Sequence, residues 1–194
     1  MNIQITKLRS APEQRLIRPV RNPPIYKDGD LRQWLLVHYC GNKPTGGLWS
    51  SSHTPTDQYT SDWERGLKTN TLIQLAYPNQ AGLVGYQLTP TGDAKVLSIA
   101  SLDDAVEFTL RYHLLTVPLP QSLRPLITPE LTDWQKAARQ WDGIHLSAEA
   151  ADEVAWASVH GEAITAFDTW NCESTLWTRW AFDNVTVCGQ ERNL

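Results

Sequence analysis

The chain has 194 residues, of which 41% are hydrophobic, and this is enough for one ordinary domain with a sizeable core. The formal net charge of -4, from 21 acidic and 17 basic residues, argues against bulk electrostatic attachment to nucleic acid. No apolar run reaches the roughly 18 residues of a membrane span, and the N-terminus lacks the layout of a secretory signal, so we expect a cytoplasmic protein without membrane contact.

The N-terminal part of the chain predicts an arm followed by the first strands. Residues 1–30 include Pro19, Pro23 and Pro24 and show little periodicity, which predicts an extended N-terminal arm before a single domain over residues 31–194. The apolar run 34–39 (WLLVHY) predicts a buried strand, and a second strand is expected to begin at Leu48. A loop rich in glycine and proline separates them.

The middle of the chain predicts a short helical turn over residues 62–66 and strands over residues 71–77 and 95–100. Ser101 is expected to cap a helix, because acidic residues follow it in the first turn, where the helix dipole favours negative charge. Apolar residues at helical spacing then mark its buried face: Ala105, Phe108, Tyr112 and Leu115.

The C-terminal part begins after a proline-punctuated connection over residues 117–129. Thr132 or Asp133 is expected to open a helix that ends at the Asp142-Gly143 turn. The remaining predicted elements are a strand over 144–146, a helix over 147–157, and strands over 174–182 and 184–188. Strands scattered among short helices predict an α+β domain with an antiparallel or mixed sheet.

Cysteine and tryptophan usage narrows the chemistry. Three cysteines without a C-x-x-C pair suggest free thiols, and we expect no metal site and no disulfide framework. Nine tryptophans are many for this length, and four of them come late in the chain: Trp156, Trp170, Trp177 and Trp180. They are either core residues or the walls of an aromatic cleft that stacks on a flat ligand.

Three segments together carry a family resemblance. The first is residues 37–41 (VHYCG) with residues 46–52 (GGLWSSS), the second is residues 141–146 (WDGIHL), and the third is residues 168–177 (DTWNCESTLW). In this order they resemble the ADP-ribosyltransferase superfamily, in its diverged bacterial and phage branches. There, a histidine-bearing strand precedes a serine-bearing strand, a "DG" segment and a late glutamate.

The resemblance implies an ADP-ribosyltransferase-like split sheet with short flanking helices, and NAD as the substrate. The histidine-bearing and serine-bearing strands of that family flank the nicotinamide and its ribose, while the glutamate holds a ribose hydroxyl. This implies catalytic roles for Glu173 and His38. The implied NAD-binding residues are His38, Tyr39, Gly47, Trp49, Ser50 and Ser51.

Each of these positions also has an ordinary structural interpretation. A histidine in an apolar strand is often a hydrogen-bonded core residue, and a serine run is often a polar strand end. Asp142-Gly143 is expected to reverse the chain and place the next strand, which gives that segment and His145 an architectural role. Glu173 lies between tryptophans in the sequence, and a carboxylate in such surroundings needs a partner or a purpose.

The chemistry of NAD cleavage agrees with the implied role of the glutamate. Breaking the nicotinamide–ribose bond creates an oxocarbenium-like centre, which a nearby carboxylate stabilises. Asn171 stands where arginine-specific enzymes carry a second glutamate, and this disfavours arginine as the modified residue. The resemblance therefore implies transfer of ADP-ribose to a macromolecular acceptor, protein or nucleic acid, in a setting of conflict between bacteria and phage.

Two other functions remain open at this point. A non-catalytic, tryptophan-rich module would bind a protein or nucleic acid by aromatic stacking, and it would not need Glu173. An RNA 2′-phosphotransferase would retain the fold but would require several basic residues around the site.

Overall fold

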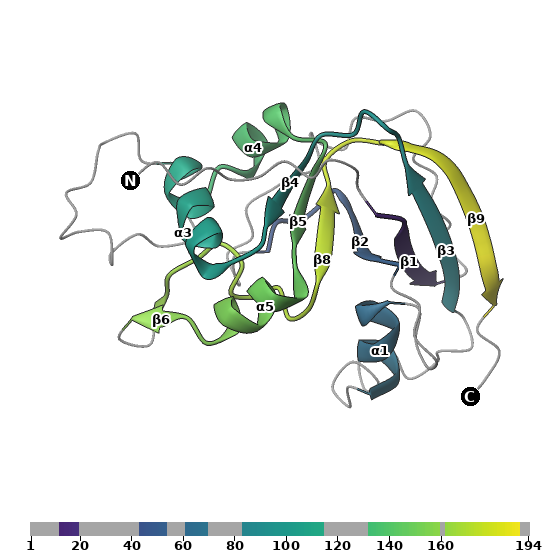
Figure 1. Ribbon diagram of the computed structural model, residues 1–194, viewed down its shortest axis with the longest axis horizontal. Coiled ribbons are helices and arrows are strands. Elements are labelled where there is room, and N and C mark those ends of the chain that lie inside the picture. The colour runs from purple at the N-terminus through teal and green to yellow at the C-terminus, as the bar shows by residue number, and fades with distance from the viewer. Residues whose placement is uncertain are drawn as a thin grey trace.

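A computed structural model of the chain describes residues 12–19, 43–53, 61–69, 83–114, 132–159 and 162–190. Within these residues, a mixed seven-stranded sheet is combined with four helices and a small hairpin (Figure 1). The expected α+β class with a mixed sheet and short helices is therefore confirmed. None of the helices in the described part of the chain is long and apolar enough to cross a membrane.

The main sheet has the strand order β4-β5-β8-β2-β1-β3-β9. β4 and β5 run parallel, and the other neighbouring strands pair antiparallel. Its strands are β1 (Gln14–Pro19), β2 (Leu48–Ser52), β3 (Leu83–Pro90), β4 (Val96–Ile99), β5 (Gly143–Leu146), β8 (Ser174–Trp177) and β9 (Phe182–Gln190). The separate hairpin consists of β6 (Ser158–Val159) and β7 (Glu162–Ala163).

The helices are α1 (Asp62–Thr69), α3 (Leu102–Arg111), α4 (Trp134–Gln140) and α5 (Ala148–Ala155). Three of them begin at side chains that accept a backbone N–H of the first turn, which satisfies one of the unpaired donors there. Ser101 caps α3, Asp133 caps α4 and Ser147 caps α5. These helix starts agree with the expected positions.

Alternate residues of the central strands enter two different cores, as the period of two along a strand requires. On the helix-covered side, Leu97, Ile144 and Leu176 pack with aromatic residues such as Phe108 of α3 and Trp134 of α4. On the other side, a second cluster joins Leu48, Val96 and Trp177 to residues from the far strands of the sheet, Tyr86, Leu88 and Phe182. β3 and β9 are curved (Figure 1), and their side chains pack against residues of the central strands β2, β4 and β8.

Several elements differ from the sequence expectation. The strand expected over residues 174–182 ends at Trp177, because Thr178 donates its hydroxyl to Trp141 O (2.6 Å) and the chain then turns before β9. β1 lies within the segment expected to be an extended arm and pairs with β2 and β3. β3 was not expected. The strands expected over residues 34–39 and 71–77 lie outside the described residues.

Candidate functional site

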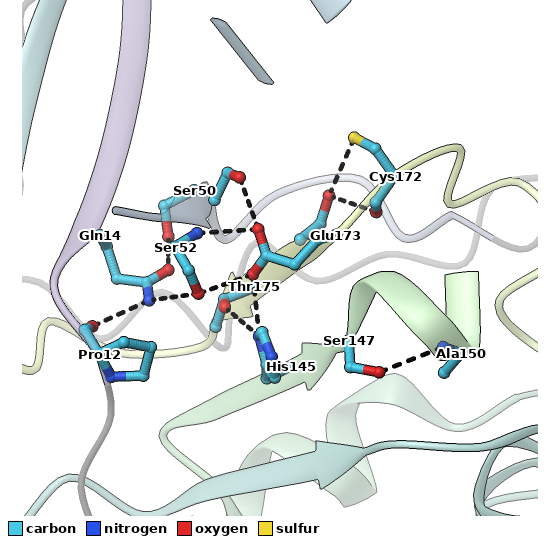
Figure 2. Close-up of polar contacts among 12 residues, drawn as sticks. Pro12, Gln14, Ser50, Ser52, His145, Ser147, Ala150, Cys172, Glu173 and Thr175 are labelled. Carbon is cyan, nitrogen blue, oxygen red and sulfur yellow. Dashed lines mark hydrogen bonds and ion pairs between the residues drawn. The ribbon is translucent and has the colours of Figure 1, made fainter. Parts of the chain in front are cut away.

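Glu173 is buried at the start of β8, and its carboxylate is surrounded by hydrogen-bond donors (Figure 2). One oxygen, Oε2, accepts the Ser51 hydroxyl at 2.5 Å and the Ser52 backbone N–H at 2.9 Å. The other oxygen, Oε1, accepts the Ser52 hydroxyl at 2.8 Å and lies 3.2 Å from Nδ1 of His145. Each oxygen thus has two neighbouring groups able to donate a hydrogen bond, which is close to the number that a carboxylate can accept.

Strand register explains why residues so far apart in the sequence meet at this point. β8 lies between β2 and β5, with Ser50 opposite Thr175 on one side and His145 opposite Thr175 on the other. Residues two apart on a strand face the same side. Glu173 therefore lies on the same face as Thr175, and Ser52 lies on the same face as Ser50. The three strands therefore bring a carboxylate, hydroxyl groups and an imidazole together.

His145 is buried and has two polar neighbours, Thr175 on β8 and Glu173 just before it. Its Nδ1 lies 3.0 Å from the Thr175 hydroxyl, in addition to the contact with Glu173. Burial lowers the pKa of His145 below its usual value, while the carboxylates of Glu173 and Glu149 act in the opposite direction. The uncharged imidazole is therefore favoured, and an N–H at Nδ1 lies within reach of either Glu173 or Thr175.

A second layer of hydrogen bonds holds the serine-bearing strand in place. Ser50 donates its hydroxyl to Oε1 of Gln14 (2.7 Å) and accepts the indole N–H of Trp177 (2.9 Å). Gln14 is itself buried, and its amide nitrogen donates to the backbone oxygen of Pro12 (3.0 Å). Ser50 thus links β2 to β1 and β8 through its hydroxyl.

The residues that the resemblance implied for NAD binding have different surroundings in the structure. Gly47 has φ 68° and, with Gly46 at φ 88°, forms the turn before β2 that an L side chain would strain. Trp49 is half-buried, with its ring 4.6 Å from that of Trp170 in an edge-to-face arrangement. Ser51 meets Glu173 directly.

Two of the implied residues, His38 and Tyr39, lie outside the described residues. Their expected positions beside the nicotinamide therefore remain predictions.

A lysine and a cysteine lie beside this network. The Lys43 ammonium nitrogen is 4.4 Å from the centre of the Trp49 ring. Burial lowers the pKa of Lys43 and raises that of the Cys172 thiol, because each charged form loses water. The pKa of Cys172 also responds to the charges of Lys43, Asp62 and Glu173, so these groups share one electrostatic environment.

The late tryptophans do not gather in one cleft. Trp170 and Trp177 are fully buried, but they belong to the two different cores on opposite sides of the sheet. Trp180 packs against the second core, and Trp156 is 88% exposed. Glu173 accordingly has polar partners from serines and a histidine, in place of the aromatic surroundings that its sequence neighbours suggested.

Sequence reasoning did not identify four members of the network as site residues: Gln14, Ser52, His145 and Thr175. His145 was assigned an architectural role, yet it contacts the candidate catalytic carboxylate. The available signal was the alternation of Glu173 with Thr175 and of Ser50 with Ser52, which places each pair on one strand face. Only the strand order shows that the two pairs are neighbours.

Comparison with known proteins identifies no relative. No family model matches the chain, and neither a curated protein nor a solved structure resembles it significantly.

Proposed function

We propose that this protein is an NAD-dependent ADP-ribosyltransferase that transfers ADP-ribose to a macromolecular acceptor, protein or nucleic acid. The observation that carries the proposal is the direct contact of Glu173 with Ser51 and Ser52, 122 and 121 residues away in the sequence. In the superfamily that the sequence resembles, a late glutamate and a serine-bearing strand meet at one ribose. Here, these two features meet in one hydrogen-bonded group.

In the proposed reaction, the bond between the ribose C1′ and the nicotinamide nitrogen breaks, and neutral nicotinamide leaves with the electron pair of that bond. Positive charge develops at C1′ and the ring oxygen. The Glu173 carboxylate stabilises this charge and accepts a hydrogen bond from the ribose 2′-hydroxyl. A nucleophilic oxygen or nitrogen of the acceptor then forms a bond to C1′ and releases its proton to solvent water, which completes the transfer.

To accept a hydrogen bond from the ribose, the Glu173 carboxylate needs a lone pair that no protein donor occupies. A change in the hydrogen bond of His145 provides one. Nδ1 of His145 lies 3.2 Å from Oε1 of Glu173 and 3.0 Å from the hydroxyl of Thr175. When the N–H points to Thr175, one lone pair of Oε1 becomes available to a ribose hydroxyl. The serine contacts then continue to hold the carboxylate in place, which is the preorganisation that electrostatic catalysis requires.

The alternative of a tryptophan-rich binding module has less support. Trp134, Trp170 and Trp177 are buried and serve as core residues, so they are not available for stacking on a partner. Among the tryptophans of the described residues, Trp156, at 88% exposure, is the one that such a module would use. A module of this kind would not need the Glu173 carboxylate, and this separates the two functions experimentally.

The proposal is tested by incubating the purified protein with NAD labelled in its adenylate portion and with whole-cell extract. Label is then measured separately in protein, RNA and DNA. We expect incorporation into one of these fractions by the wild type and little by Glu173→Gln. Equal labelling by the two proteins would remove Glu173 from the reaction, and absence of label from all three fractions would refute macromolecular transfer.

A further inference from the structure

Lys43 is a half-buried cation that lies over an aromatic ring. Its ammonium nitrogen lies over Trp49, 4.4 Å from the ring centre. No ion pair joins Lys43 to a carboxylate of the described part of the chain. A cation–π contact offsets only part of the cost of removing an ammonium group from water, which favours an anion as a further partner.

The position of Lys43 relates it to the Glu173 site. Trp49 precedes the serines on β2, and its ring is fixed edge-to-face on the buried Trp170. Cys172 is adjacent to Glu173 in the sequence, and its thiol experiences the charges of both Lys43 and Glu173. Trp49 and Ser51 are two residues apart on β2 and so face the same side of the strand, and Ser51 contacts Glu173. The amine over Trp49 therefore lies on the side of β2 from which Ser51 reaches the carboxylate, and one extended ligand is suited to contact both.

We propose that Lys43, held against Trp49, binds the pyrophosphate of the dinucleotide while Glu173 engages the nicotinamide ribose. This inference rests on the proposed function. A pyrophosphate is the anionic part of NAD, and it is joined directly to the ribose that Glu173 would hold. A lysine serves well as a point charge for phosphate, and binding supplies a counter-charge to an amine that forms no ion pair with a carboxylate of the described residues.

The test measures binding by calorimetry with three probes: inorganic pyrophosphate, ADP-ribose and nicotinamide. Lys43→Gln should weaken binding of pyrophosphate and ADP-ribose about 10-fold or more, while nicotinamide binding stays the same. Lys43→Arg should retain most of the affinity for both anions, because it keeps the charge. Lys95→Gln is the matched control, since it removes an exposed lysine from the described part of the chain.

The possible outcomes separate this inference from the proposed function. Anion binding that Lys43→Gln weakens and Lys43→Arg retains supports the subsite, even if the wild type cleaves no NAD and the transferase proposal fails. If the wild type cleaves NAD but Lys43→Gln binds both anions as tightly as the wild type, the subsite is refuted and the transferase proposal stands. A wild type that binds neither anion also refutes the subsite.

Discussion

Replacement of Glu173 by glutamine should leave a folded protein that cleaves NAD roughly 10²–10³ times more slowly, the effect of losing one preorganised electrostatic group. The amide keeps the volume and one acceptor oxygen. If that oxygen takes the place of Oε2, the Ser51 hydroxyl and the Ser52 N–H retain their acceptor. The amide nitrogen then takes the place of Oε1, where the Ser52 hydroxyl and Nδ1 of His145 must become acceptors.

The same contacts give the expected change in stability. Hydrogen bonds to a charged group contribute about 1.5–3 kcal/mol, and neutral ones about 0.5–1.5 kcal/mol. Rotation of the Ser52 hydroxyl and a change of the His145 tautomer limit the loss, so we expect a decrease of about 1–3 kcal/mol in the free energy of unfolding. For a chain of this size, each kcal/mol corresponds to roughly 2–4 °C in melting temperature.

The assay combines a melting curve, NAD binding by calorimetry and the rate of NAD cleavage for the wild type and Glu173→Gln. The account predicts a lower melting temperature, nearly unchanged NAD binding and a large loss of rate. A variant that folds, binds NAD and cleaves it at the wild-type rate would show that the Glu173 charge has no part in cleavage. Glu173→Asp is the matched control: it keeps the charge but shortens the side chain, so its loss of rate reports on positioning.

Three further predictions concern neighbouring residues. Ser51→Ala removes one hydrogen bond to Oε2 of Glu173, and about 10-fold slower NAD cleavage is expected, measured at saturating NAD with Ser51→Thr as the hydroxyl-retaining control. Because the pKa of His145 is lowered on folding, its contribution to stability is present above about pH 6.5 and decreases as the pH falls towards the folded-state value. Urea unfolding between pH 8 and 5 should therefore show a shallower decrease for His145→Gln than for the wild type, and parallel curves would contradict this. Gly143→Ala would place a methyl group 3.2 Å from Cε3 of the buried Trp177, so unfolding should require about 1–3 kcal/mol less; an unchanged melting temperature would show that the ring moves freely.

Local signals were sufficient to predict much of the helical part of the fold. Ser101, Asp133 and Ser147 have short polar side chains followed by helix-forming residues, and capping depends only on groups within three positions. The strand over residues 143–146 was also recognisable, since its short apolar run follows a turn. Such features are predictable because their causes lie within a few residues.

Long-range pairing accounts for what the sequence did not predict. β3 contains Gly85 and polar residues, and it is stabilised as a strand by pairing with β1 and β9, which come from opposite ends of the chain. The sequence likewise predicted that the strand continues beyond Trp177, because it gave no sign of the hydrogen bonds of Thr178 to the loop before β5. Propensity alone carries no information about these partners.

The candidate site shows the same division. Ser51 and Glu173 were expected at one site only because of the resemblance to a family, and the patterns of neighbouring residues gave no sign of their contact. His145 and Gln14 join the network only because β5 and β1 flank the strands that carry those two residues. Their roles therefore depend on strand order, which the sequence did not reveal.

Nicotinamide release from NAD is the direct measure of the proposed activity, because transfer to water as well as to a macromolecule begins with cleavage of the same bond. The measurement uses NAD labelled in the nicotinamide ring and compares the wild type, Glu173→Gln and Lys95→Gln. The account predicts release by the wild type and the Lys95 variant, and release slower by roughly 10²–10³ with Glu173→Gln. Wild-type release no faster than in the absence of protein, with and without cell extract, would contradict it.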